Sequence, residues 1–233
     1  MLKPKKLDWD SNFFKISIGQ ISISSTEQME YGIDAKGFDL IYIFSDVILN
    51  DSIQFSYRGT KVKFYKKLAF NFYESDFNIE NIEPDYYYTN IETIRNLAYE
   101  SGHFSRFNID NQFKKNYFHK FYDKWVENAL NLAHDNIFCI YKNSLNKMPI
   151  ALITGSINED SCLSKVGLFA VDKNHQGIGL GRSMLKHFEM LSIKNNQFEI
   201  EINTQLDNIS ACKFYESQGY LQIDLKYIYH LWI

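Results

Sequence analysis

The order of apolar segments in the C-terminal part of the chain limits the possible folds more than any other feature of the sequence. Seven segments follow one another as strand, strand, strand, helix, strand, helix and strand: residues 136–142, 149–157, 162–171, a helix from about Gly181, residues 197–203, a helix from about Asn208, and residues 220–232. Consecutive strands pair antiparallel, whereas a helix between two strands favours a parallel pair. We therefore predict an α/β (α+β) fold with a mixed, mostly antiparallel sheet flanked by helices.

The N-terminal part of the chain has its own set of strands. Alternating or apolar runs predict strands at residues 14–24, 38–44 and 61–70. The acidic stretch 73–88, around Pro84, interrupts this pattern and is the best candidate for a linker. We therefore predict a smaller N-terminal α/β domain, residues 1–82, in front of a larger domain, residues 83–233.

Two helical patterns follow this stretch. Residues 90–102 begin with Asn90 as a candidate cap and end at Gly102. Residues 111–130 repeat aromatic side chains at four-residue steps, a stripe that is usually buried in a core. The loop "HFSRF", residues 103–107, places a histidine and an arginine among aromatic rings, and loops held between helices often contact substrates.

Three glycines at alternate positions, Gly177, Gly179 and Gly181, lead into the first C-terminal helix. Such a turn favours a phosphate group, because backbone N–H groups and the helix dipole face the anion. A dinucleotide-binding fingerprint needs G-x-G-x-x-G directly after the first strand of a doubly wound domain, which is not the context here. A nucleoside triphosphatase loop needs Lys-Ser or Lys-Thr, and the chain has Arg182-Ser183. The phosphate therefore belongs to another class of ligand.

The pattern Gln176-x-x-Gly179-x-Gly181 resembles the Q/R-x-x-G-x-G/A signature of the GNAT superfamily, the acyl-CoA-dependent N-acyltransferases. The surrounding "VGLFAVDKNHQGIGLGRSML" is similar to the family's fourth strand and third helix. Further on, "NTQLDNISACKFYESQGY" is similar to its fifth strand and the following helix. The resemblance covers residues 137–232. It implies a GNAT fold and an enzyme that transfers an acyl group from acyl-CoA to an amine.

The resemblance also assigns residues to the co-substrate. The glycine turn would hold the pyrophosphate of coenzyme A, and the preceding strand would hold the pantetheine arm and supply a main-chain N–H to the oxyanion. The implied coenzyme A contacts are Leu168, Phe169, Ala170, Val171, Gln176, Gly177, Ile178, Gly179, Leu180, Gly181, Arg182, Asn203, Asn208 and Tyr215. Tyr215 would also donate a proton or a hydrogen bond to the leaving thiolate.

A general base for the amine is harder to assign. Many family members carry a carboxylate on the fourth or fifth strand, and residues 164–171 have none. Glu199 and Glu201 lie on one face of the next strand by its two-residue period. His103 is the other candidate catalytic residue, and a chain of water molecules could also take the proton.

The acceptor is suggested by a second resemblance. Residues 7–21, "LDWDSNFFKISIGQI", and the segments "SGHFSRF" and "FYDKWVENAL" are similar to bacterial GNAT enzymes of the dTDP-fucosamine acetyltransferase type, which acylate dTDP-linked amino sugars. The implied substrate-binding residues are Phe104, Ser105, Arg106 and Tyr117. Arg106 could pair with a diphosphate, and the rings could face thymine or the deoxysugar. The family's R-x-P-W-Y continuation is replaced by "RFNIDNQF", so an amine at C-3 and one at C-4 both stay open.

The acyl group is also open, because acetyl-CoA and a 3-hydroxybutyryl-CoA-like thioester both suit such a site. The product would serve surface polysaccharide synthesis, such as O-antigen or capsule, and residues 1–82 would lie on the sugar-nucleotide side or at a dimer contact. One alternative is an N-acetyltransferase for another amine, such as a protein N-terminus, an antibiotic or a polyamine. The other is a non-catalytic acyl-CoA-binding protein, although such a protein would be expected to lose Tyr215 or the glycines.

Composition sets further expectations. With 25 Lys and Arg against 28 Asp and Glu, the net charge is -3, which gives no basic field for nucleic acid. No apolar run reaches the roughly 20 residues of a membrane span, and the start lacks a signal peptide pattern, so we expect a cytoplasmic protein without membrane insertion. The cysteines form no C-x-x-C pair, so we expect no metal. The resemblance and the aromatic content favour a homodimer.

Overall fold

The computed structural model describes residues 1–50, 55–69, 77–114, 116–131, 136–142, 147–158 and 162–233. Along the chain, the elements within these residues are β1 (Lys5–Lys6), α1 (Asp8–Phe14), β2 (Ile18–Ile23), η1 (Thr26–Tyr31), β3 (Leu40–Ser45), β4 (Ser56–Lys67), β5 (Ile79–Asn81), α2 (Pro84–Thr89), α3 (Ile91–Ser101), α4 (Arg106–Ile109), α5 (Tyr117–Asn131), β6 (Asn136–Lys142), β7 (Pro149–Asn158), β8 (Leu163–Val171), η3 (Lys173–His175), α6 (Leu180–Lys194), β9 (Glu199–Gln205), α7 (Ile209–Ser217) and β10 (Leu221–Trp232).

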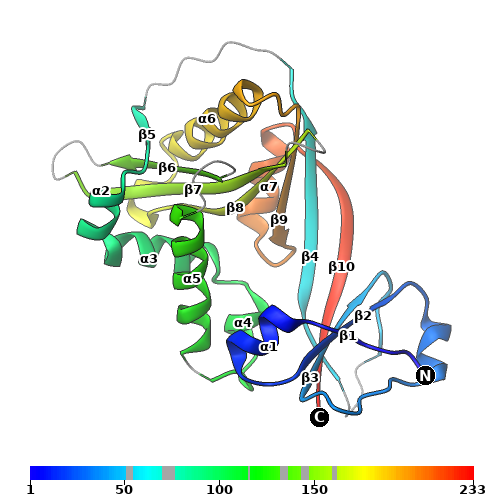
Figure 1. The fold of residues 1–233 in the computed structure, drawn as a ribbon. Helices are drawn as coiled ribbons and strands as arrows, with labels where there is room; N and C mark the ends of the chain where they lie inside the picture. The colour runs from blue at the N-terminus through cyan, green and yellow to red at the C-terminus, as the bar shows by residue number, and fades with distance from the viewer. Residues whose placement is uncertain (51–54, 70–76, 115, 132–135, 143–146, 159–161) are drawn as a thin grey trace.

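These strands pair in one sheet in the order β1-β2-β3-β10-β4-β9-β8-β7-β6-β5 (Figure 1). The pairs β2–β3 and β8–β9 are parallel, and the other pairs are antiparallel. The predicted mixed, mostly antiparallel sheet with flanking helices is confirmed. Strand β4 lies between β9 and β10, so strands from both sides of the predicted boundary after residue 82 share the sheet. The division into two domains stays a prediction.

Helices cover both faces of the C-terminal part of the sheet (Figure 1). One face packs on α6 and α7 in a core that includes Val166, Met184 and Phe188. The opposite face packs on α2, α3 and α5 in a second core that includes Leu168 and Ala170. Val166, Leu168 and Ala170 would share one face in a regular strand. They do not share it here, so β8 must be irregular between residues 166 and 168.

The strands of the C-terminal part begin and end within two residues of their predicted positions, whereas the stretch proposed as a linker contains structure. Part of that stretch, residues 73–76, lies outside the described residues. The rest contains β5, which pairs with β6, and α2. The linker prediction is therefore wrong for this part, because Ile79 is buried against the sheet and Pro84 begins a helix rather than breaking one.

Asn90 and Gly102, the predicted cap and stop of α3, have other roles than the predicted ones. Asn90 makes no capping bond to α3, because its side-chain amide donates to the carbonyl of Tyr86 at the end of α2 (3.0 Å). The helix ends before Gly102 as predicted, but the φ of Gly102 is -94°, outside the left-handed region. The glycine is required for space, since a Cβ there would lie 2.1 Å from Cζ of Tyr122.

The aromatic helix begins at Tyr117, six residues later than predicted. The preceding residues turn around Asp110, whose Oδ1 accepts a hydrogen bond from the backbone N–H of Gln112 (3.1 Å). The other carboxylate oxygen binds Nδ1 of His230 (2.5 Å) and Nε1 of Trp232 (3.0 Å). Asp110 therefore attaches the segment between α4 and α5 to the end of β10. Among the described residues, no helix has both the length and the apolar character needed to cross a membrane.

Candidate active site

The site begins where two neighbouring strands separate. Strands β8 and β9 lie wholly within the described residues, and their parallel pairing ends at Val166 and Ile202. Residues 167–171 of β8 and 203–205 of β9 then line one cavity of about 1280 Å³. An opening between parallel strands exposes main-chain N–H and C=O groups to a ligand. The cavity can therefore bind an extended ligand through the backbone of β8.

The irregularity in β8 is a β-bulge. Ile153 of β7 is opposite Phe169, but Gly155 is opposite Val166, so two residues of β8 face Thr154 alone. The hydroxyl of Thr154 accepts a hydrogen bond from the N–H of Leu168 (2.8 Å). This N–H is therefore already bound, and the oxyanion donor expected on this strand is better sought at the other residues of the segment 168–171.

Replacing Thr154 by Val should destabilise this bulge. Thr154 is 1% exposed, and Val has nearly the same shape but cannot accept the hydrogen bond of Leu168. An unsatisfied buried N–H costs about 1–3 kcal/mol. We expect the free energy of unfolding in urea to fall by roughly this amount, and kcat/KM to fall a few-fold. Thr154→Ser keeps the oxygen and should retain the kcat/KM of the wild type. Equal unfolding free energies for the Val variant and the wild type would contradict this role of Thr154.

The glycine turn, which follows β8 and leads into α6, also lines the cavity. Gly177 and Gly179 have φ values of +80° and +88°, in the region that favours glycine. The side-chain amide of Gln176 donates to the carbonyl of Val171 (2.9 Å), which fixes the turn against the end of β8. Gly181 has an ordinary conformation, and an added Cβ would meet only ordinary contacts at 3.7 Å. The positive φ values thus require glycine at positions 177 and 179, whereas Gly181 leaves space beside the start of α6.

The residues of the glycine turn differ in how they face the cavity. Gln176, Gly177, Gly179, Gly181 and Arg182 line the cavity. The side chain of Ile178 is 58% exposed, and that of Leu180 is buried in the core, so these two could contact a ligand only through the backbone. The first turn of α6 contains no acidic residue. An anion at this helix start would therefore meet the positive end of the helix dipole without a nearby carboxylate on the helix.

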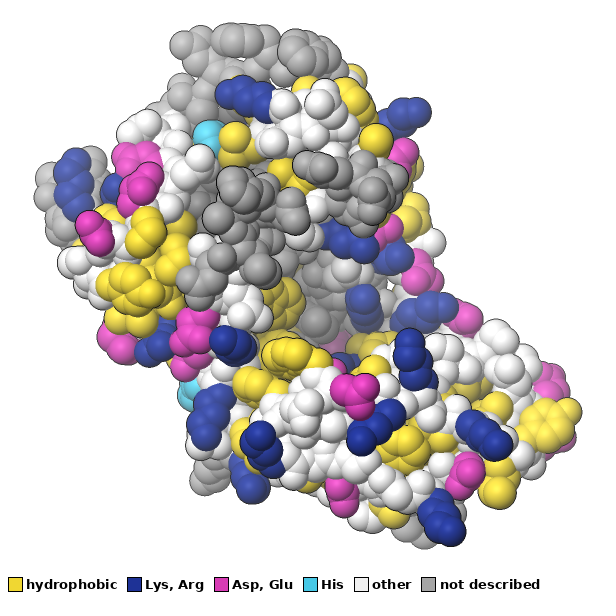
Figure 2. Space-filling view, viewed as in Figure 1, with side chains coloured by type: hydrophobic (Ala, Val, Ile, Leu, Met, Phe, Trp, Pro, Cys, Tyr) yellow, Lys and Arg dark blue, Asp and Glu magenta, His cyan; other side chains and the backbone are white. Residues whose placement is uncertain are grey.

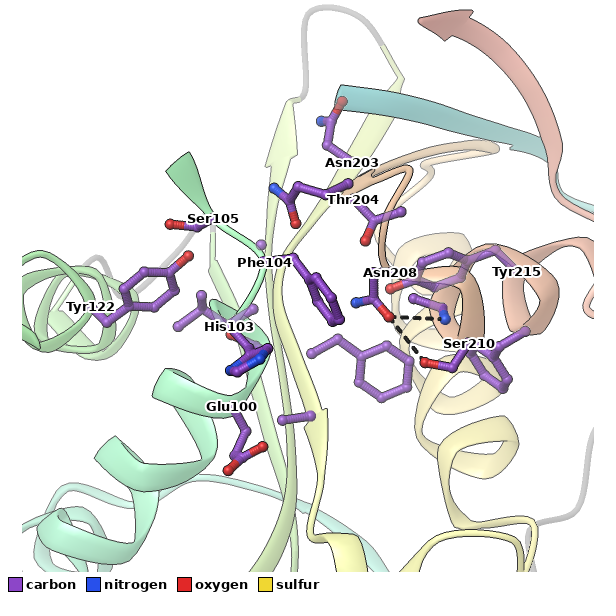
Figure 3. A pocket seen from close by; sticks show the side chains of 18 of the residues that line it. Glu100, His103, Phe104, Ser105, Tyr122, Asn203, Thr204, Asn208, Ser210 and Tyr215 are labelled. Carbon is purple, nitrogen blue, oxygen red and sulfur yellow. Dashed lines mark hydrogen bonds between the residues drawn. The ribbon is translucent and has the colours of Figure 1, made fainter. Parts of the chain in front are cut away.

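Asn208 and Tyr215 lie on the α7 side of the cavity, together with Asn203 of β9 (Figure 3). Asn208 caps α7: its side-chain oxygen accepts from the N–H of Ala211 (3.2 Å) and the hydroxyl of Ser210 (3.0 Å). This cap fixes the direction of α7. Seven residues after Asn208 the helix places the side chain of Tyr215 against the cavity.

The ring of Tyr215 is buried and packs on Phe64, Phe214 and Tyr220, with ring centroids 5.5, 5.5 and 6.2 Å away. Among the described residues no hydrogen-bond partner holds its hydroxyl, which can therefore bind a ligand. Burial raises the pKa of Tyr215 above its ordinary value of 10. The phenol is thus neutral and available as a donor throughout the physiological pH range.

The opposite wall of the cavity comes from the segment between α3 and α5 (Figure 3). His103, a candidate catalytic residue, lines the cavity together with Phe104, Ser105 and Arg106, three of the candidate acceptor-binding residues; their roles stay predictions. Ser105 caps a short helix, since its Oγ accepts from the N–H of Phe107 (3.2 Å), so the predicted loop continues into α4. Tyr117 does not line the cavity: its hydroxyl donates to the carbonyl of Phe14 (2.9 Å). The structure gives Tyr117 a role in packing.

Arg106 has an unusual environment. Its guanidinium lies over the rings of Tyr42, Phe107 and Phe44, at 3.9, 4.7 and 5.2 Å from the centroids. The Nη1 atom is buried and has no hydrogen-bond partner among the described residues. Burial lowers the pKa of Arg106, but an arginine stays charged in proteins. A buried cation without a partner is a strong candidate to bind an anion.

The candidate bases differ from expectation. Neither Glu199 nor Glu201 lines the cavity, and Glu201 pairs with Lys63 (3.7 Å). Two carboxylates that sequence reasoning missed do line it: Asp10 on α1 and Glu100 at the end of α3. Glu100 pairs with Lys173 (2.9 Å). Burial raises the pKa of Asp10, while the charge of Arg106 opposes this shift.

The cavity is also lined by side chains that were not predicted to be site residues. The further lining residues on the acceptor side are Trp9, Phe44, Arg58, Lys61, Phe121, Tyr122 and Trp125. The four-residue steps of the aromatic helix did mark Phe121 and Trp125, but as core residues. The described residues contain no group of three or more His, Cys, Asp or Glu side chains arranged to hold a metal ion.

Comparison with known proteins agrees with this geometry. The sequence profile of the acetyltransferase (GNAT) family matches residues 96–220, more than half of the chain. The chain is 25% identical over 142 residues to the spore coat polysaccharide biosynthesis protein SpsD of Bacillus subtilis (strain 168), which covers 60% of this chain and 47% of SpsD. The chain thus spans about half the length of this curated relative.

Two solved structures have a similar fold. One is a conserved protein of unknown function from Staphylococcus epidermidis ATCC 12228, with a TM-score of 0.61 and 14% identity over 93% of this chain and 84% of that chain. The other is a putative GNAT acetyltransferase from Novosphingobium aromaticivorans DSM 12444, with a TM-score of 0.55 and 11% identity over 84% of this chain and 75% of that one. At these identities the similarity concerns the fold alone.

Proposed function

The chain belongs to the acetyltransferase (GNAT) family and has its fold, and from this premise we propose that it transfers an acyl group from acyl-CoA to the amino group of a dTDP-linked amino-dideoxysugar. The observation that carries this proposal is that one cavity joins the glycine turn and Tyr215 to a wall containing Arg106 and several aromatic rings. The first set of residues suits coenzyme A, and the second suits a nucleotide-linked sugar.

The chemistry is a direct transfer. The lone pair of the substrate amine attacks the thioester carbonyl, an N–C bond forms, and the carbonyl oxygen becomes an oxyanion. Main-chain N–H groups of residues 169–171 on β8 are the proposed donors to this oxyanion, because the N–H of Leu168 is bound to Thr154. The C–S bond then breaks, the sulfur leaves as a thiolate, and the nitrogen loses its extra proton to solvent or to a base. A cavity that holds both reactants lowers the entropic cost of this step.

Tyr215 is the proposed partner of the leaving sulfur. Full proton transfer from a phenol of pKa about 10 to a thiolate of pKa about 8.5 is uphill by roughly 2 kcal/mol. Burial raises the pKa of Tyr215 further, which makes full transfer less favourable still. Tyr215 therefore acts as a hydrogen-bond donor to the thiolate, and the proton that finally reaches the sulfur is the one lost by the ammonium nitrogen of the tetrahedral intermediate.

The pH profile of the reaction should reflect this role. Because the pKa of Tyr215 is raised, the phenol remains protonated at pH values where an ordinary tyrosine begins to ionise. Only the amine then titrates, and kcat/KM should rise with pH through the pKa of the amine, about 8, and stay level between about pH 9 and pH 10. Initial rates of thiol release across this range provide the measurement. A loss of activity above about pH 8 that disappears in Tyr215→Phe would contradict the assignment.

The acceptor proposal has two supports. SpsD, to which the chain is similar, is named for spore coat polysaccharide biosynthesis, and sugar transfer in such routes generally starts from nucleotide-linked sugars. The unpartnered guanidinium of Arg106 lies in the cavity among aromatic rings. We accordingly propose that the product serves surface polysaccharide synthesis. We also propose that the enzyme acts as a homodimer. His103, which lines the cavity, is proposed to lie near the reacting amine.

A panel assay tests the acceptor class. Acetyl-CoA and 3-hydroxybutyryl-CoA are each combined with dTDP-3-amino and dTDP-4-amino dideoxysugars, and free thiol is followed. We expect turnover with at least one of these pairs. Turnover with a polyamine, an antibiotic or a peptide N-terminus, and with no nucleotide sugar, would replace the proposed acceptor by another amine. Binding of acyl-CoA without turnover of any amine would indicate a non-catalytic acyl-CoA-binding protein.

A further inference from the structure

Two cationic side chains face the acceptor side of the cavity without a counter-ion. Lys61 on β4 and Arg106 at the start of α4 both line the cavity. Neither forms an ion pair within 4.0 Å in the part of the chain that the structure describes. Burial lowers the pKa of Lys61, and the charges of Lys63 and Arg106 lower it further, while the charges of Asp224 and Glu201 oppose this shift. Because Lys61 and Arg106 line one cavity, an anion bound there would face both cations.

Neighbouring cations are paired, which sets Lys61 and Arg106 apart. Arg58, three residues before Lys61, binds the buried carboxylate of Asp110 (3.2 Å). Lys63, on the same face of β4 as Lys61, pairs with Glu201 (3.7 Å) and lies outside the cavity. Arg58 also lines the acceptor side of the cavity, but its charge is already paired. Lys61 and Arg106 line the same side without an ion pair among the described residues.

The nearest carboxylate does not satisfy Arg106. Asp10 lines the same end of the cavity, and its charge and that of Arg106 influence each other's pKa. No ion pair within 4.0 Å joins them among the described side chains. Asp10 therefore reduces the positive charge here without filling the hydrogen-bonding position of Nη1.

An exposed aromatic side chain lines the same cavity as the two cations. Trp9 is 49% exposed and lines the cavity; one face of its indole stacks on Phe13 (5.0 Å, 8°). Ring contacts lead from Trp9 to Phe121 (6.0 Å), from Phe121 to Phe107 (4.4 Å), and from Phe107 to the guanidinium of Arg106 (4.7 Å). In the space-filling view, Lys and Arg side chains gather where the molecule is hollowed between its upper and lower parts (Figure 2). A ligand that is aromatic at one end and anionic next to it fits this arrangement.

We propose that Lys61 and Arg106 bind the diphosphate of a nucleoside diphosphate group and that the indole of Trp9 stacks on its base. The inference rests on the proposed function in one respect, because it takes this group to be part of the acceptor. Lys61 supplies a flexible point charge from β4, and Arg106 supplies a planar, oriented guanidinium from α4. Together they would select a nucleotide-linked amino sugar over a free amino sugar.

Calorimetric titration of the full chain tests the subsite directly. The protein is first saturated with CoA, so that the glycine turn is occupied, and is then titrated with dTDP, with inorganic pyrophosphate or with thymidine. We expect dTDP to bind more tightly than pyrophosphate and far more tightly than thymidine. Lys61→Gln should weaken dTDP and pyrophosphate about ten-fold, the loss typical of one charge-assisted hydrogen bond. Trp9→Leu should weaken dTDP and leave pyrophosphate unchanged.

Lys63→Gln is the matched control, since it removes the same charge from the same face of β4 outside the cavity. Its dTDP affinity should equal that of the wild type. Unchanged CoA affinity in each variant shows that the fold is retained. Arg106→Lys, which conserves the charge, provides a second test of the diphosphate site formed by Lys61 and Arg106. The inference is overturned if dTDP fails to bind the CoA-saturated protein, or if Lys61→Gln and Lys63→Gln have the same dTDP affinity.

Acyl transfer to nucleotide sugars, measured in parallel, separates this inference from the proposed function. Loss of dTDP binding in Lys61→Gln, without turnover of any nucleotide sugar by the wild type, supports the subsite and rejects the proposed acceptor. Turnover of a nucleotide sugar with the same KM in wild type and Lys61→Gln supports the proposed function and overturns the subsite. If both hold, Lys61→Gln raises KM and leaves kcat nearly unchanged.

Discussion

Replacing Tyr215 by Phe should lower kcat about 10²-fold, the lower end of the range for loss of an acid–base or donor group. The ring keeps its contacts with Phe64, Phe214 and Tyr220, so the fold is retained. Only the hydroxyl, which no partner holds among the described residues, is removed. Steady-state thiol release gives kcat, and calorimetry gives the Kd of CoA, which should change less than about two-fold.

The neighbouring Tyr220 is the control for this substitution. Its hydroxyl donates to Glu189 (3.1 Å) in a buried cluster and does not line the cavity. Tyr220→Phe should therefore lower the free energy of unfolding by about 1 kcal/mol and leave kcat nearly unchanged. Wild-type kcat in Tyr215→Phe would remove Tyr215 from the chemistry, whereas an equal loss in both variants would indicate a general effect on packing.

Replacing Gly179 by Ala should weaken the binding of CoA about 10- to 30-fold. The φ of Gly179 is +88°, and a left-handed conformation costs a residue with a Cβ about 1–2 kcal/mol. The turn can relieve this strain only by changing conformation, which moves the N–H groups proposed to face the pyrophosphate. Calorimetric titration with CoA measures the effect, and substrates of the acceptor side should bind as before.

Gly37→Ala provides the matched control. Gly37 has a φ of +84° and does not line the cavity, and no atom of the described residues beyond its two chain neighbours lies within 4 Å of its added Cβ. This substitution carries the same backbone cost without the proposed ligand contact. Both variants should lose about 1 kcal/mol of unfolding free energy, and only Gly179→Ala should lose CoA affinity. Unchanged CoA affinity in Gly179→Ala would place the pyrophosphate elsewhere.

The C-terminal half of the fold was predictable because its signals are local. Each strand from β6 to β10 has a contiguous apolar or alternating pattern, and the turn before α6 has glycines at the two positions that need positive φ. The cap of α7 by Asn208 is also a local bond, three residues long. Such features depend on neighbours in sequence, so periodicity and motif spacing detect them.

The acceptor side was predictable only in part because its geometry depends on long-range contacts. The start of α5 is set by Asp110 and its bonds to His230 and Trp232, more than one hundred residues away in sequence. Lys61 enters the cavity because β4 pairs between β9 and β10, a topology that no local pattern indicates. The bulge at Thr154 likewise depends on pairing between β7 and β8. For these residues the sequence gives no signal beyond composition.

We propose that the two walls of the cavity hold the two reactants of one acyl transfer. The most direct measurement is to quantify, in the same reaction, CoA thiol released from acetyl-CoA and N-acylated sugar formed from a dTDP-amino-dideoxysugar. We predict one N-acylated nucleotide sugar for each thiol released, and loss of both products together in Tyr215→Phe. Thiol release without an N-acylated sugar, or no release with any nucleotide sugar, would contradict the account.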